Sequence, residues 1–152
     1  MSLKESESEK MVYSALTIAE YVLYYAKMKG YGLSSLQLLK ILYFVQAQFL
    51  VFKKMPAFAD KMTAASWGPV VKSVWDRYSA YGNAFIPVVN DNAKLKILTE
   101  DVKLIEEVED LLLGFSNSSL LDVISQQEPF KKGRRNAPDC EIKNSYLQEF
   151  FK

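Results

Sequence analysis

Between Leu36 and Phe52 the chain is apolar on almost every side, and this run determines the fold that we predict. Ser34 and Ser35 stand directly before this run. Serine hydroxyls readily accept hydrogen bonds from the free amide N–H groups of a first helical turn. Apolar residues all round a helix are typical of a helix that other helices surround. The pattern therefore predicts a central buried helix over about residues 35–53, in a single compact, mainly α-helical domain.

The few polar residues of this helix are expected to have two kinds of surroundings. Gln37, Lys40 and Gln48 fall close to one line along the helix. Phe44 lies among them, and such a line predicts the solvent-facing edge of a buried helix. Gln46 lies off the line among apolar neighbours, so we expect its amide to hydrogen-bond inside the domain.

Shorter amphipathic segments flank the central helix on both sides. Their apolar residues recur every three or four positions, which places them on one helical face. On this basis further helices are predicted over residues 10–29, 69–81, 99–113, 120–126 and 140–151. Two short apolar runs on either side of Asn90-Asp91-Asn92 predict instead a minor β-hairpin near residues 84–98.

Composition narrows the class of protein. The chain has 152 residues, one cysteine and no histidine, and its 19 basic and 18 acidic residues leave a net charge of +1. One thiol and no imidazole exclude an internal disulfide, the usual zinc sites and the Ser-His or Cys-His nucleophile pairs. Residues 1–10 are mostly polar, which predicts a disordered tail and no signal peptide before a domain over 11–152. We expect a cytoplasmic, non-enzymatic protein with no cofactor, metal or membrane span.

Tyrosine is concentrated around the first predicted helix. The residues are Tyr13, Tyr21, Tyr24, Tyr25 and Tyr31. We expect the rings to be buried and the hydroxyls to lie at the surface or in hydrogen bonds. The alternative is a tyrosine-rich contact surface, because tyrosine is enriched at protein interfaces.

Charged residues form two local clusters. An acidic cluster in the helix predicted over 99–113 is expected to be a solvated face, and it comprises Glu106, Glu107, Glu109 and Asp110. A basic run at residues 131–135 is predicted to be a loop that contacts water, an acidic protein or phosphates. No aromatic residues are interleaved with it, so a protein partner is favoured over nucleic acid. Together with the predicted loop at 53–61, it supplies the candidates for partner contact, which are Lys53, Lys54, Lys131, Lys132, Arg134 and Arg135.

Three segments of the chain resemble one known family. Residues 36–46, LQLLKILYFVQ, are similar to its run of Leu, Gln and Lys before Leu-Tyr-aromatic-x-Gln. Residues 65–71, ASWGPVV, are similar to its Ala-Trp-x-x-Gly-Pro-Val segment, with a tighter spacing after Trp67. Near the C-terminus, Gln126 stands where members often carry His, and Phe130 replaces Trp. On these motifs the chain resembles the Panacea domain, which includes SocA-like antitoxins and proteolytic adaptors and GepA-like phage-associated proteins.

The resemblance covers most of the chain from Thr17 onward and implies a non-enzymatic binding domain. It implies an antitoxin-like protein that neutralises a co-encoded toxin by direct contact. The alternatives are a protease adaptor and a nucleic-acid-binding regulator, carried on a prophage or mobile element. A structural role is implied for the motif residues, which are Leu36, Gln37, Leu39, Lys40, Leu42, Tyr43, Gln46, Trp67, Gly68, Pro69, Val70, Pro129 and Phe130.

Overall fold

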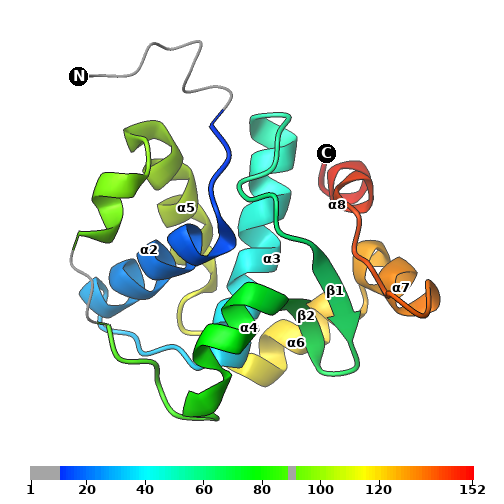
Figure 1. The fold of residues 1–152 in the computed structure, drawn as a ribbon, viewed down its shortest axis with the longest axis horizontal. Helices are drawn as coiled ribbons and strands as arrows, with labels where there is room; N and C mark the ends of the chain where they lie inside the picture. The colour runs from blue at the N-terminus through cyan, green and yellow to red at the C-terminus, as the bar shows by residue number, and fades with distance from the viewer. Residues whose placement is uncertain (1–10, 89–91) are drawn as a thin grey trace.

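The computed structural model describes residues 11–88 and 92–152, which fold around one long central helix (Figure 1). Its elements in chain order are α2 (Ala15–Met28), α3 (Ser35–Phe52), β1 (Met62–Ala65), β2 (Gly68–Val71), α4 (Lys72–Tyr78), the 3-10 helices η1 (Ser79–Tyr81) and η2 (Ala93–Lys96), α5 (Thr99–Leu112), α6 (Asn117–Ser125), α7 (Glu128–Arg135) and α8 (Asn144–Phe151). Strand β2 and the helices α2, α5, α6 and α8 all pack against α3. This confirms the mainly α-helical fold around a buried central helix. The tail predicted at residues 1–10 lies outside the described residues.

The central helix α3 begins where its sequence predicts. The Ser34 Oγ accepts the backbone N–H of Gln37 at 3.3 Å, and the Gln37 Oε1 accepts the backbone N–H of Ser34 at 2.9 Å. This reciprocal pair satisfies amide groups that a helix start otherwise leaves unbonded. By length and hydropathy α3 alone among the described helices could cross a membrane, but 67% of it is buried inside the domain. Its apolar character is therefore accounted for by the core.

Besides Ser35 at its first position, α3 buries the polar side chains of Lys40 and Gln46, although the sequence predicts burial for Gln46 alone. The Gln46 Oε1 accepts the N–H of Ala57 at 2.8 Å, and its Nε2 donates to the carbonyl of Phe58 at 2.9 Å, which confirms the internal hydrogen bonds. Lys40 is only 1% exposed, and its Nζ donates to the Trp67 carbonyl at 3.1 Å. The predicted solvent-facing edge is wrong at Lys40, because the β-hairpin covers it.

The minor hairpin of the fold consists of β1 and β2, which pair antiparallel from Met62 opposite Val71 to Ala65 opposite Gly68. A two-residue turn at residues 66–67 joins them. Gly68 has a φ of +131°, and a Cβ at this position would lie 2.9 Å from the Lys40 Nζ. The backbone conformation and the close approach of Lys40 therefore both require glycine here.

This hairpin does not lie near residues 84–98, so the predicted position is wrong. Residues 93–96 form η2, which packs on α2 and buries Ala93. The backbone N–H of Ile86 donates to the Leu33 carbonyl at 2.9 Å, so the preceding segment is held by the loop before α3. Short hairpin strands are marginal by themselves, and here contacts with the helical body replace their pairing. Asn90 and Asp91 lie outside the described residues.

Three helices before α7 begin at residues other than those predicted, and the first of them, predicted from residue 10, begins at Ala15 after a cap at Ser14. The helix predicted from residue 69 begins at Lys72, because Pro69 pairs with Ala64 in the hairpin instead of starting a helix. The helix predicted from residue 120 begins at Asn117, because the Ser116 Oγ accepts a first-turn amide N–H at 3.1 Å. In each case a local pairing or cap of the preceding residues sets the boundary.

The basic run at 131–135 was predicted to be a loop, and this prediction is wrong. These residues are the last five of helix α7. Pro129 stands in the first turn, where its missing N–H leaves no hydrogen bond broken. Gly133 faces the hairpin so closely that a Cβ would lie 3.1 Å from the Cβ of Ala64. The N–H of Ala64 also donates to the carbonyl of Cys140 at 2.7 Å. Glu141 forms an isolated antiparallel bridge with Thr63 of the hairpin, so the last helix begins only after this bridge, at Asn144 instead of Cys140.

Tyrosine hydroxyls join α5 to the chain around α2. Three of them donate to carboxylates of α5, namely Tyr13 to Asp101, Tyr21 to Glu106 and Tyr25 to Asp110. The expectation of hydrogen-bonded hydroxyls is confirmed for these residues. Glu109 is 0% exposed, and its two carboxylate oxygens have no hydrogen-bond partner among the described residues. The interpretation of the acidic cluster as a solvated face is therefore wrong for Glu109.

Candidate functional site

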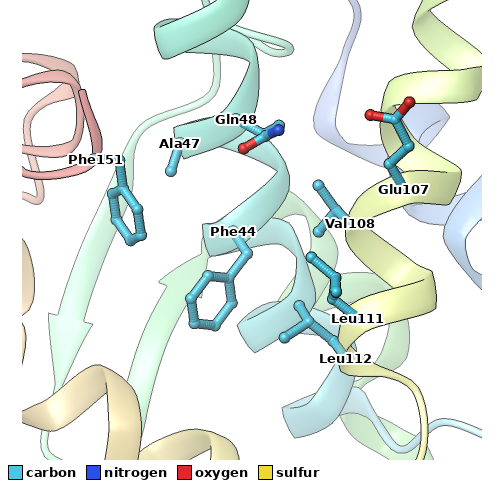
Figure 2. A pocket seen from close by; sticks show the side chains of 8 residues that line it. All are labelled: Phe44, Ala47, Gln48, Glu107, Val108, Leu111, Leu112 and Phe151. Atoms are coloured by element: carbon cyan, nitrogen blue, oxygen red, sulfur yellow. The ribbon is translucent and has the colours of Figure 1, made fainter.

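An open groove lies over α3 between α5 on one side and α8 on the other, with a volume of about 350 Å³ (Figure 2). The floor comes from α3, and side chains of α5 and α8 form the two walls. The lining residues are Phe44, Ala47 and Gln48 of α3, Glu107, Val108, Leu111 and Leu112 of α5, and Phe151 of α8. The lining is mostly apolar, which is typical of a surface that binds another molecule.

The groove follows a strip of α3 that its neighbours leave partly uncovered. Phe44 and Gln48, one turn apart, are half-buried, whereas Tyr43, Val45 and Phe49 beside them are buried. Leu111 on the opposite wall is 76% exposed. A single exposed apolar side chain needs no explanation, but a contiguous apolar surface marks an interaction site. These side chains form such a surface.

Aromatic rings build the wall on the α8 side. The rings of Phe44 and Phe151 are 6.1 Å apart between centroids and meet edge to face. Phe150 stands next to them, with its ring centroid 4.9 Å from that of Phe151, and remains 45% exposed. Edge-to-face contact is a preferred arrangement of aromatic rings. The groove therefore has an aromatic wall opposite the aliphatic one.

Two polar side chains, Gln48 and Glu107, stand at one end of the groove (Figure 2). Neither makes a hydrogen bond or an ion pair with a residue in the described part of the chain. Glu107 is exposed and Gln48 is half-buried. The apolar groove therefore ends at a carboxylate and an amide whose hydrogen-bonding capacity is available to a binding partner.

Sequence reasoning did not find this groove, although one signal for it was present. Phe44 interrupts the polar line of α3, and Leu111 lies outside the buried face formed by Val102, Ile105 and Val108. Apolar residues on otherwise polar faces are the expected mark of a binding surface. The part contributed by α8 carried no such signal, because only the fold brings Phe151 beside Phe44.

The predicted basic candidates on α7 are largely engaged within the protein. The Arg135 Nη2 lies 2.7 Å from the Glu128 Oε1, and this hydrogen bond is the main cause that lowers the pKa of Glu128. The Arg134 Nη1 donates to the carbonyl of Ala64 at 3.1 Å. Lys132 lies over the ring of Tyr146 at 5.2 Å, and Lys131 is exposed.

The other two basic candidates differ from each other. The Lys53 Nζ lies 2.5 Å from the Asp101 Oδ1 and 3.6 Å from the Glu100 Oε1, with the Lys53 side chain 18% exposed. Lys54 is exposed and has a φ of +60°. No contact among the described residues joins this pair to the cations of α7, so the structure does not bring the six candidates together in one site.

The polar motif residues connect α3 to the segments that follow it. Lys40 holds the hairpin turn and Gln46 holds the loop at 57–58, as described above. The Tyr43 hydroxyl donates to the Gln127 Oε1 at 2.8 Å, at the start of α7. The ring of Trp67 is 37% exposed and lies 4.9 Å from that of Trp75.

The remaining motif residues are mostly packed around α3. Buried members are Leu39, Leu42, Gly68, Pro69, Pro129 and Phe130, and partly buried ones are Leu36, Gln37 and Val70. These positions and the hydrogen bonds above are those of residues that hold the fold together. Among the described residues, no group of three or more cysteine, aspartate and glutamate side chains is placed to hold a metal ion.

Fold and groove together define a mainly α-helical domain with an open apolar surface over its central helix. Residues 38–130, well over half of the chain, match the family model described as antitoxin SocA-like, Panacea domain. The chain therefore belongs to this family. No curated protein and no solved structure matches it. The matched residues include most of α3 and all of α5 but not α8, so the aromatic wall at Phe151 lies outside them.

Proposed function

We propose that this protein is an antitoxin that acts in the cytoplasm and neutralises a co-encoded toxin by direct binding. The observation that carries the proposal is membership of the antitoxin SocA-like family. The groove adds a surface of suitable chemistry, because protein interfaces have an apolar, aromatic centre and a polar rim. Phe44, Leu111 and Phe151 would form the centre, and Gln48 and Glu107 part of the rim.

Neutralisation by binding needs a stable surface and no chemistry of its own, so we infer a non-enzymatic role. The polar side chains inside the core support this. The ammonium of Lys40 and the amide of Gln46 are buried and bonded to backbone carbonyls of the same domain. Their hydrogen bonds are used to fix loops on α3, which is what a rigid binding scaffold requires.

A nucleic-acid-binding role receives less support. It would depend on the cations of α7, and three of the four contact other groups of this domain. Free lysines and arginines that neutralise several phosphates are needed for appreciable affinity. A protein partner is therefore the better interpretation.

The test uses the genes on either side of this one in its genome. Each neighbour is expressed alone and then together with this protein, and growth and co-purification are measured. Rescue of growth with recovery of a complex supports the proposal. If no neighbour arrests growth and none co-purifies, the proposal fails. Rescue that depends on degradation of the toxin would indicate a protease adaptor instead.

A further inference from the structure

The groove over α3 has the form of a place for one additional helix. α5 and α8 pack on α3 on opposite sides of the groove, and α3 lies between them as the floor (Figure 2). The lining residues of the α5 wall and of the floor are spaced by one helical turn, as in Val108 and Leu112 of α5 and in Phe44 and Gln48 of α3. A helix laid over Phe44 would therefore meet ridges of side chains with its own periodicity.

The walls also disfavour an extended segment. A peptide that adds a strand binds to unpaired N–H and C=O groups at the edge of a sheet. Here both walls and the floor are helices, so the groove has no strand edge with which an extended segment could pair. Contacts in the groove are made mainly through side chains, as they are by the apolar face of an amphipathic helix.

The charge at the end of the groove specifies the partner further. Glu107 is the charged residue among those that line the groove, and it makes no ion pair with any described residue. Lys103 lies one turn before it on α5 but does not come within ion-pair distance of it. A lysine or arginine beside the apolar face of the incoming helix would pair with Glu107 and donate a hydrogen bond to the amide oxygen of Gln48.

We infer that the groove over α3 binds an amphipathic helix of the partner protein, with apolar anchors on Phe44, Leu111 and Phe151 and a basic residue at Glu107. This inference rests on the proposed function, because it assumes that the partner is a protein. It commits to the helical form and to the sign of the charge. A second copy of this chain would be a different occupant, and the experiment separates the two.

The test selects peptides without any toxin. A displayed library of helical peptides, randomised at apolar and charged positions, is selected on the full chain. We expect enriched peptides with apolar residues at the i, i+3/i+4, i+7 spacing and a basic residue at one end. Their affinity, measured by fluorescence polarisation, should fall about thirtyfold with Leu111→Glu, the loss typical of an interface hot spot. Leu95→Glu on η2, equally apolar and 81% exposed, is the matched control and should leave affinity unchanged.

The charge is tested by reversal. With Glu107→Lys, the selected peptides should lose affinity, and variants with glutamate in place of the basic residue should regain it. Four outcomes would overturn the inference. They are no enrichment, binding unaffected by Leu111→Glu, no change in charge preference with Glu107→Lys, and a dimer that Leu111→Glu dissociates. Growth rescue by an unmodified neighbour gene remains a separate result, so failure here does not imply failure of the antitoxin role.

Discussion

The two sides of α5 differ sharply in how their acidic residues are used. On the closed side, Asp101, Glu106 and Asp110 accept hydrogen bonds from tyrosines and Glu109 is buried. On the open side, Glu107 makes no ion pair with a described residue, and Leu111 is 76% exposed at the groove. One helix thus uses carboxylates to close the domain and leaves an apolar surface beside them. Contacts with other segments of the domain, and not the acidic sequence of the helix alone, separate structural carboxylates from those available to a partner.

The largest loss of stability on the closed side of α5 is expected when the carboxylate of Asp101 is removed. This carboxylate is 0% exposed and accepts from the Tyr13 hydroxyl at 2.6 Å and from the Lys53 Nζ at 2.5 Å. Asp101→Ala leaves both donors without this acceptor, so we expect the free energy of unfolding to fall by about 3–5 kcal/mol. Urea denaturation measures it. Asp76→Ala is the control, because Asp76 is exposed in a surface pair, and it should cost less than about 1 kcal/mol.

The buried carboxyl of Glu109 gives the closed side a dependence on pH. Burial, helped by the charges of Asp110 and Glu106, raises the pKa of Glu109 well above 4.5. Above that pH the unfolded chain loses this proton while the folded chain keeps it, so folded protein binds more protons. Stability therefore falls as pH rises, at up to about 1.4 kcal/mol per pH unit, until the folded pKa is passed.

Glu109→Gln should remove this decline, because the amide does not ionise. Urea unfolding between pH 4.5 and pH 7 compares the variant with the wild type, and the advantage of the variant should grow with pH. A difference between Glu109→Gln and wild type that stays constant with pH would refute the buried, protonated state.

Lys40 offers a further test within the core, with the opposite sign. Burial lowers the pKa of Lys40 from 10.5 to about 8. Between these values the folded chain loses the proton first, so stability rises with pH from about 8 to 10.5. Lys40→Met should abolish this rise, because methionine has no proton to lose. Lys72→Met, at an 86% exposed side chain, is the control. A stability profile of Lys40→Met that parallels wild type above pH 8 would contradict the prediction.

A substitution on the open side of α5 should have the smallest effect on the free energy of unfolding. Leu111→Glu replaces a side chain that is 76% exposed, so we expect its free energy of unfolding to change by less than about 0.5 kcal/mol. Leu95→Glu should behave in the same way. Thermal unfolding of the two variants provides the measurement. A large loss confined to Leu111→Glu would show that the groove wall is part of the core.

The sequence was sufficient for the parts of the fold that local rules control. The apolar run of α3 and the cap at Ser34 determine the central helix, and they do so without distant contacts. The position of the hairpin and the helical structure of residues 131–135 depend on contacts between segments distant in sequence. Helix α7 packs closely on β1 at Gly133, and the local sequence around Gly133 does not predict this contact.

The candidate site shows the same limit. The motifs indicated the family, and Gln46 was correctly expected inside. The burial of Lys40 and Glu109 could not be predicted, because each is covered by an element distant in sequence, the hairpin and α2. The groove requires Phe44, Leu111 and Phe151 from three helices, and periodicity along one helix does not place the others beside it.

Binding of the partner at the groove over α3 is tested most directly by measuring the affinity of this protein for the neighbour-encoded protein whose toxicity it relieves. Calorimetric titration would compare wild type, Leu111→Glu and Leu95→Glu at the same salt concentration. If the partner binds at the groove, Leu111→Glu alone should lose about thirtyfold or more in affinity, with the fold unchanged. Equal affinities for all three proteins would contradict the claim that the open side of α5 is where the partner binds.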